Sequence, residues 1–253
     1  MSKHANIKLV VAYDGTNFLG WQKTKTGRSV EEELEKVLTQ VLQHEIKLQA
    51  ASRTDAGVHA TGQVVNFFTT KDISFSKLHI ALNSLLPQDV AVVTVDEMPE
   101  AFHPTLDCTG KEYHYNICYG ITQLPHRRLY SWHSPHKFEI AKMDEAIPFL
   151  IGSHDFSSFC NTKKNEEYTD SVRDLQQISI VNLPDNTLRF ELRGNSFLYK
   201  MVRNLVGTLV YVGQGKIQSK ELPGILAARS RPLAGVTAPA HGLFLHQVLF
   251  STP

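Results

Sequence analysis

The chain has 253 residues, of which 42% are hydrophobic and 20% are charged, a composition typical of a globular protein with a sizeable core. Its formal net charge of +1 neither favours nor excludes a polyanionic partner. The longest apolar stretch, residues 205–212, is far shorter than the ~20 residues of a membrane-spanning helix, so we expect no membrane partner.

The cysteines indicate a reducing environment. Cys108, Cys118 and Cys160 are an odd number, and none belongs to a C-x-x-C pair. A disulfide framework and a zinc site are therefore not expected. Residues 1–6 are polar and lack the apolar run of a secretory signal. Together these features predict a cytoplasmic protein.

The first half of the chain is predicted to contain strands and helices in the order β-α-β-β-α-β. Alternating apolar residues predict a strand over residues 7–13. Ser29 and Glu32 form an S-x-x-E capping box, which predicts a helix from Ser29 to about Gln43. The next predicted elements are strands at residues 46–51 and 63–68, a helix at residues 75–86, and a strand at residues 90–95.

The second half is predicted to repeat that order. Its predicted elements are a strand at residues 112–119, a helix at 140–151, strands at 172–181 and 188–192, helices at 196–212 and 220–228, and a strand at 243–250. The polar stretch of residues 152–169 is predicted to be a long loop. These patterns predict an α+β fold of two ferredoxin-like halves, residues 1–105 and 106–253, packed with a cleft between them.

Basic residues are concentrated near the C-terminus. From Asn195 onward, six Lys or Arg residues stand against one acidic residue, Glu221. Such a segment is compatible with a phosphate-binding face. From charge alone, a solvated helix face remains the favoured interpretation.

A short segment between the second and third predicted strands combines charged side chains with small residues. It reads Ser52-Arg53-Thr54-Asp55-Ala56-Gly57-Val58-His59-Ala60. Small residues let the backbone approach a ligand, and a carboxylate such as that of Asp55 can act as a nucleophile without a cofactor. From these residues alone, a turn held by side-chain-to-backbone hydrogen bonds is the favoured interpretation.

This segment resembles the G-R-T-D-A-G-V-H signature of the tRNA pseudouridine synthase A family, and further matches follow in order over nearly the whole chain. They are Tyr13-Asp14-Gly15 with Gly20-Trp21-Gln22, Ser29-Val30-Glu31, Gly62-Gln63-Val64-Val65, Phe102-His103, Lys111-Glu112-Tyr113-His114-Tyr115, His154-Asp155-Phe156-Ser157-Ser158-Phe159, and Asn195-Ser196-Phe197-Leu198-Tyr199-Lys200-Met201-Val202-Arg203-Asn204. Their order and extent exclude a chance match.

The resemblance implies a pseudouridine synthase fold and an enzyme that isomerises uridine to pseudouridine in the anticodon arm of tRNA, at positions 38 to 40. The nucleophile of the family falls on Asp55, and its uracil-stacking tyrosine falls on Tyr113. The arginine that helps hold the target base out of its stack falls on Arg53. The arginine that pairs with the catalytic carboxylate falls on Arg203. The family works as a homodimer, without a metal or an organic cofactor.

The residue chemistry fits these roles but leaves alternatives open. A flipped uracil can stack on an aromatic ring for ~1–3 kcal/mol, yet Tyr113 also alternates with Tyr115 as a core strand residue would. Arg203 lies at the edge of an apolar helical arc, where an arginine can either aim inward to keep a carboxylate ionised or extend to water. His59 is interpreted as structural. Three routes to pseudouridine stay open: Asp55 attacks ribose C1′, attacks the uracil ring, or assists elimination to a glycal.

Two positions depart from the family pattern. Ser52 replaces the usual glycine before the arginine, and we expect little effect unless the backbone needs a positive φ there. Pro104-Thr105 replaces the usual Ala-Arg after Phe102-His103, so a substrate contact made by that arginine is expected to be weaker or to be made by another cation. The cations considered as replacements are Lys163, Lys164, Arg127 and Arg128.

Three rival functions are a non-catalytic RNA-binding protein on the same scaffold, a synthase acting on another RNA, and a structural protein without an RNA partner. The combination of Asp55, Tyr113 and Arg203 argues against the first, because simple binding needs no carboxylate facing a polyanion. Activity on isolated RNAs tests the second, and salt-dependent RNA binding tests the third.

Overall fold

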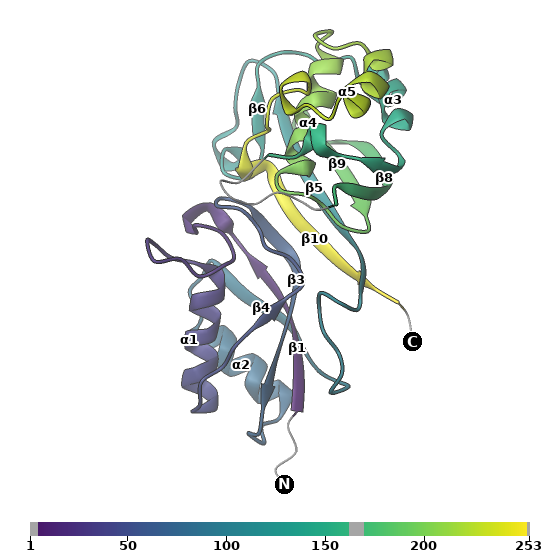
Figure 1. Ribbon diagram of the computed structural model, residues 1–253. Coiled ribbons are helices and arrows are strands. Elements are labelled where there is room, and N and C mark those ends of the chain that lie inside the picture. Colours follow the sequence, from purple (N-terminus) through teal and green to yellow (C-terminus); the bar gives the residue numbers. More distant parts are fainter. Residues whose placement is uncertain (1–4, 162–169, 252–253) are drawn as a thin grey trace. The chain divides into compact units, whose positions relative to one another are not determined.

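The computed structural model describes residues 5–161 and 170–251 (Figure 1). The chain divides into two compact units. The first unit comprises the chain up to Thr109 together with the segment from Phe244 onward, and the second comprises Gly110–Leu243. Both units combine strands with helices, so the predicted α+β class is confirmed.

The first unit is built around a sheet in which β1 is flanked by two partners. Its elements are β1 (Ala5–Tyr13), the 3-10 turn η1 (Gly15–Asn17), α1 (Val30–Leu42), β2 (Gln49–Ala50), β3 (His59–Thr69), α2 (Phe75–Leu85), β4 (Val90–Met98) and β10 (Leu243–Phe250). β1 pairs antiparallel with β3 and β4, and β2 pairs antiparallel with β3. The predicted order β-α-β-β-α-β is confirmed here, although β2 is shorter than predicted.

Local sequence signals explain how these elements form. The Ser29 Oγ accepts a hydrogen bond from the Glu32 amide at 3.3 Å, and α1 begins at the next residue, as the capping box predicts. Figure 1 shows α1 and α2 side by side, and both helices bury leucines. On β1, alternate residues such as Leu9 and Val11 are fully buried, as expected for a strand with one face on a core.

β10 brings a distant part of the sequence into the first unit. It pairs in parallel with β3, with Phe244 opposite His59 and Leu245 opposite Ala60. The predicted division assigned residues 243–250 to the second half, whereas the compact units place this strand from Phe244 onward with the first. Local periodicity describes single elements and carries no information on pairing between segments this far apart.

Within the second unit the strands are paired in the order β5-β9-β8-β7, and β6 pairs in parallel with β5. Its strands are β5 (Cys108–Tyr119), β6 (Trp132–Ser134), β7 (Gly152–Asp155), β8 (Val172–Leu183) and β9 (Thr187–Gly194). Its helices are α3 (Ile140–Ala146), α4 (Met201–Gly213) and α5 (Leu222–Ala228), with 3-10 turns η2 (Pro125–Arg127), η3 (Ile147–Phe149), η4 (Ser157–Phe159), η5 (Ser219–Glu221), η6 (Arg231–Leu233) and η7 (Ala240–Gly242).

The sequence pattern missed two short strands of this unit and misplaced the start of one helix. β6 and β7 span 3 and 4 residues, too few for alternation to be recognised, and β7 lies in the stretch predicted as a loop. α4 begins at Met201 rather than Ser196. The Asn195 Oδ1 accepts hydrogen bonds from the Ser196 amide at 2.6 Å and the Asp174 amide at 3.1 Å, which holds this chain in a turn. Lys200 then adopts a left-handed conformation with φ of 60°, which prevents an earlier helix start.

The helices of both units are modest in length. α1 and α4 each span 13 residues. Across residues 5–161 and 170–251, none of the helices combines the length and the apolar character that crossing a membrane requires.

Candidate active site

The predicted catalytic segment forms the connection between β2 and β3. The Trp21 amide donates to Thr54 O at 3.0 Å, and the hydroxyls of Tyr13 and Thr54 share a hydrogen bond at 2.7 Å. The Val58 amide donates to Asp55 O at 3.1 Å, which closes a tight turn. The backbone on both sides of the Asp55 side chain is therefore fixed, while that side chain is half-buried.

A glycine allows the neighbouring segment to approach this loop. Gly20 has a φ of +103°, and a Cβ built there would lie 2.6 Å from Thr54 O. A side chain at this position would meet backbone rather than a movable side chain, so the approach requires glycine. Trp21, the next residue, is 1% exposed and reinforces the contact through its amide. The role of Gly20 was not predicted, although its position in the Gly-Trp-Gln match was a signal that could have revealed it.

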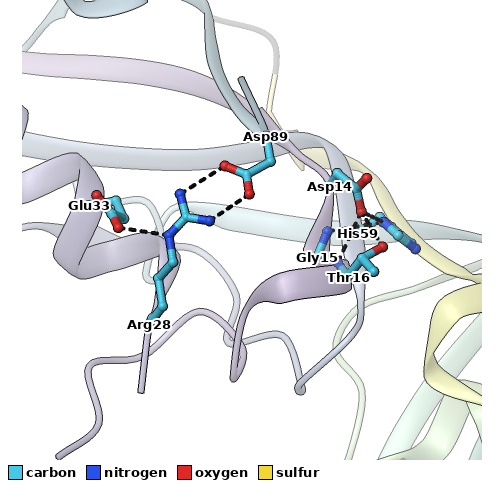
Figure 2. A network of polar contacts seen from close by, with 7 residues as sticks. All are labelled: Asp14, Gly15, Thr16, Arg28, Glu33, His59 and Asp89. Carbon is cyan, nitrogen blue, oxygen red and sulfur yellow. Dashed lines mark hydrogen bonds and ion pairs between the residues drawn. The ribbon is translucent and has the colours of Figure 1, made fainter. Parts of the chain in front are cut away.

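His59 lies at the base of the loop and is held on several sides (Figure 2). Its ring is 1% exposed and stacks on Phe244, with ring centroids 4.6 Å apart. The Gly15 amide lies 3.0 Å from the His59 Nδ1, and the Asp14 Oδ1 lies 3.1 Å from the same atom. Nδ1 can accept from Gly15 or donate to Asp14, but not both at once. Either bond ties the start of β3 to η1, which supports a structural role for His59.

A second group of charged residues braces the same region (Figure 2). The Arg28 guanidinium donates to both carboxylate oxygens of Asp89, at 2.6 and 2.9 Å, and to Glu33 at 2.7 Å. The Asp14 amide donates to Asp89 O at 2.9 Å. Through Asp89, the turn that contacts His59 is therefore connected to α1 and to the residues just before β4.

Tyr113 occupies a packed position on β5. It lies opposite Leu192 of β9 and is 7% exposed. The Phe197 ring meets it edge-on, with ring centroids 5.1 Å apart and an interplanar angle of 82°. This contact fixes the plane of the Tyr113 ring, a property shared by core aromatics and by rings on which a base stacks.

Arg203 extends from α4 into surroundings that are largely buried. Its Nε donates to Ala238 O at 2.6 Å, and the Ala238 amide donates to Arg203 O at 3.1 Å. Burial raises the pKa of Tyr115 well above its usual 10.0, and the positive charge of Arg203 opposes that rise. Burial lowers the pKa of His241, and the charge of Arg203 lowers it further, although a backbone hydrogen bond with Ser131 acts in the opposite direction. The guanidinium therefore acts electrostatically on both groups.

The structure places the predicted site residues in two groups. Arg53 and Asp55 lie two positions apart in the β2–β3 loop of the first unit, and the Arg53 side chain is exposed. Tyr113 and Arg203 belong to the second unit, on β5 and α4.

The two departures from the family pattern have local explanations. Ser52 is not one of the described residues that have a positive φ, so a serine fits at this position without backbone strain. Its carbonyl accepts a hydrogen bond from the Gln63 Nε2 at 2.6 Å. The Thr105 Oγ1 donates to Ala50 O at 2.8 Å, which ties this segment to β2. Of the cations considered as replacements, Arg127 ends η2 and Arg128 follows it, whereas Lys163 and Lys164 lie outside the described residues.

Comparisons with known proteins extend over most of the chain. A family model described as tRNA pseudouridine synthase matches residues 9–107 and 146–251. The chain is 56% identical over 246 residues to tRNA pseudouridine synthase A 2 of Protochlamydia amoebophila (strain UWE25), covering 97% of this chain and 94% of that protein. It is 42% identical over 246 residues to tRNA pseudouridine synthase A of Bacillus pumilus (strain SAFR-032), covering 96% and 98%. Arg53, Asp55 and Arg203 fall within the matched ranges of the family model, and Tyr113 falls between them.

Proposed function

The chain belongs to the tRNA pseudouridine synthase family, and we propose that it isomerises uridine to pseudouridine in the anticodon stem-loop of tRNA, at positions 38, 39 and 40. The observation that carries this proposal is 56% identity to a tRNA pseudouridine synthase A over 97% of the chain. The reaction breaks the bond between uracil N1 and ribose C1′, turns the base and joins its C5 to the same C1′. The C5 proton is then lost and N1 gains a proton.

We propose Asp55 as the nucleophile of this reaction. A carboxylate can attack without a metal or an organic cofactor, so the proposed mechanism includes neither. The hydrogen bonds at Thr54 and Val58 support the assignment, because they fix the backbone from which the carboxylate projects. A reacting group held in place in this way loses little freedom on the path to the transition state.

We propose three further residues as substrate-binding groups. Tyr113 stacks on the flipped uracil, and Phe197 supports this role by fixing the ring plane. Arg53 helps hold the target nucleotide out of its stack, which its exposed side chain permits. Arg203 pairs with the catalytic carboxylate, and its buried surroundings support this role because a charge acts more strongly where water is excluded.

We also propose that the protein acts in the cytoplasm as a homodimer. A tRNA is large enough to contact two subunits at once. Cys108, Cys118 and Cys160, all within the described residues, are not joined to one another by disulfides, which is compatible with a reducing compartment. Light scattering of the purified protein tests the dimer: a particle with twice the mass of the chain supports it, and a monomer contradicts it.

The test of the proposed function is a map of pseudouridine in unmodified tRNA after incubation with the protein. We expect pseudouridine at uridines 38 to 40 and none in a tRNA carrying cytidine at those positions. If the protein binds tRNA with strong salt dependence but forms no pseudouridine, the non-catalytic RNA-binding function replaces this proposal. If pseudouridine forms only in another RNA, the reaction stands and the substrate is wrong.

Substitution of His59 by Asn is expected to leave the single-turnover rate within about tenfold of wild type, whereas loss of a general base costs about 100-fold or more. The amide of Asn can still bond Gly15 or Asp14, but it loses the stacking on Phe244. We therefore expect a lower melting temperature together with substantial turnover. A nearly inactive variant with a native circular dichroism spectrum would show that His59 takes part in the chemistry.

A further inference from the structure

Arg231, at the start of η6, places its guanidinium among neutral oxygens. Its Nη1 donates to Gly235 O at 2.8 Å, and its Nη2 donates to Asn204 Oδ1 at 2.9 Å and to Thr237 Oγ1 at 2.8 Å. Its Nε donates to Asn161 Oδ1 at 3.4 Å. Burial lowers the pKa of Arg231. None of these four bonds is an ion pair, so the site uses the planar fork of the side chain to hold several groups at once.

Asn204 is the centre of this network and is fully buried. Its Nδ2 donates to Phe159 O at 2.7 Å and to Asn161 Oδ1 at 2.8 Å, and its Oδ1 accepts from Thr237 Oγ1 at 2.7 Å. All the polar atoms of the side chain are therefore used, as a buried amide requires. Asn204 directly follows Arg203 on α4, so the network is anchored beside the proposed partner of the catalytic carboxylate.

Residues 231–238, here called the strap, run against α4. Arg231 holds the middle of the strap through Gly235 O. The Gly235 amide donates to Thr208 Oγ1 at 2.9 Å, and the Ala238 amide donates to Arg203 O at 3.1 Å. The strap is thus attached to α4 at its middle and at its end.

The end of the strap also binds the side chain of Arg203. The Arg203 Nε donates to Ala238 O at 2.6 Å, so the position of this carbonyl sets the plane of the guanidinium. We propose that Arg231 is a positioning residue for pseudouridine formation, which holds the strap so that Ala238 keeps Arg203 in its working orientation. The inference rests on the proposed function and on the role proposed there for Arg203.

The alternative is that Arg231 only stabilises the fold. Arg231→Lys distinguishes the two roles, because lysine keeps the charge but cannot direct a planar fork at Gly235 and Asn204 together. Arg229→Gly is the matched control. It removes an exposed arginine that lies two residues before Arg231 and pairs with Asp155 instead of the strap, at a left-handed position with φ of 49° that glycine adopts without strain.

The first measurement observes Arg203 directly by NMR of its Nε–H group. In the wild type this proton is expected to be protected from exchange with water by its bond to Ala238. Arg231→Lys is expected to reduce the protection by about five- to tenfold, the factor that corresponds to one lost hydrogen bond. Arg229→Gly is expected to leave it unchanged. Full protection in Arg231→Lys overturns the inference.

The second measurement is the single-turnover rate of pseudouridine formation. Arg231→Lys is expected to lower this rate by about 10- to 100-fold, the effect of a misplaced reacting group, with the Kd for tRNA unchanged. In an Arg203→Ala background it is expected to have no further effect, because the positioned group is absent. Thr237→Val, which removes one hydroxyl from the network, is expected to act in the same direction more weakly and serves if Arg231→Lys does not fold.

The outcomes separate this inference from the proposed function. If Arg231→Lys slows the wild type and Arg203→Ala by the same factor, Arg231 acts on the fold in general and the inference is wrong. If Arg203→Ala is as fast as the wild type, the role of Arg203 fails and the inference fails with it. If the wild type forms no pseudouridine, the proposed function fails, while the NMR measurement still decides whether Arg231 orients Arg203.

Discussion

Asp55→Ala is expected to lower the single-turnover rate of pseudouridine formation by about 10⁴-fold or more, the scale of losing an essential nucleophile. The three routes open to the proposed nucleophile are attack on ribose C1′, attack on the uracil ring and assisted elimination. Each would use this carboxylate, so we expect the variant to be inactive by every route. Asp55→Asn is expected to be equally inactive, because an amide of the same shape is a poor nucleophile. Both variants are expected to keep the fold, because the backbone hydrogen bonds at Thr54 and Val58 hold the loop.

The Kd for tRNA distinguishes a variant that has lost the chemical step from one that no longer binds its substrate. The Kd of Asp55→Ala for tRNA is expected to stay the same or to fall, because removing a negative charge favours association with phosphates. Asp96→Ala provides the control, since Asp96 is a more exposed aspartate of the first unit whose carboxylate lies 3.3 Å from Lys8. It is expected to keep the wild-type rate. A rate loss below about tenfold in Asp55→Asn would rule out Asp55 as the nucleophile.

Gly207→Ala is expected to destabilise the protein by about 3 kcal/mol or more, near the upper range for overpacking a core. A Cβ at Gly207 would lie 1.7 Å from Val236 O, so the strap would have to move away from α4. The obstacle is backbone, which cannot turn aside as a flexible side chain can. Because Ala238 at the end of the strap holds Arg203, we also expect slower turnover from the protein that remains folded.

Thermal unfolding tests this expectation against a matched substitution. A loss of this size corresponds to a melting temperature lower by about 6–12 °C. Gly224→Ala makes the same change in α5, where a Cβ would meet nothing within 4 Å. There the lower backbone entropy of alanine is expected to stabilise the protein by up to about 1 kcal/mol. Shifts of the same sign and size in both variants would contradict the proposed close packing of the strap.

The parts of the fold that the sequence predicted are those decided by local chemistry. Contacts within a few residues determine the Ser29 cap of α1, the burial of alternate residues on β1 and the helical conformation of α2. The start of α4 was misplaced because the apolar pattern continues back to Phe197, while Asn195 and Lys200 impose turns. The place of β10 beside β3 depends on a pairing that periodicity does not contain.

The residues of the candidate site also divide into those that sequence motifs reveal and those that only the fold reveals. Arg53 and Asp55 could be named because they lie together in one short motif, and Tyr113 and Arg203 could be named from motifs that resemble a known family. Arg231 was counted only as part of a basic segment. Its partners are carbonyl, hydroxyl and amide oxygens on three separate segments, so no charge pattern or spacing marks it. Side chains that act through neutral acceptors are found only when the fold is known.

The parallel pairing of β10 with β3 also constrains the order in which the protein can mature on the ribosome. Synthesis runs from the N-terminus, so residues 110–243 must be made before Phe244 can reach His59. At about 5–20 residues per second, this delay is on the order of ten seconds. During that time, the edge of β3 at His59 and Ala60 lacks its β10 partner. The strand that follows the proposed catalytic loop is thus among the last parts of the first unit to be completed.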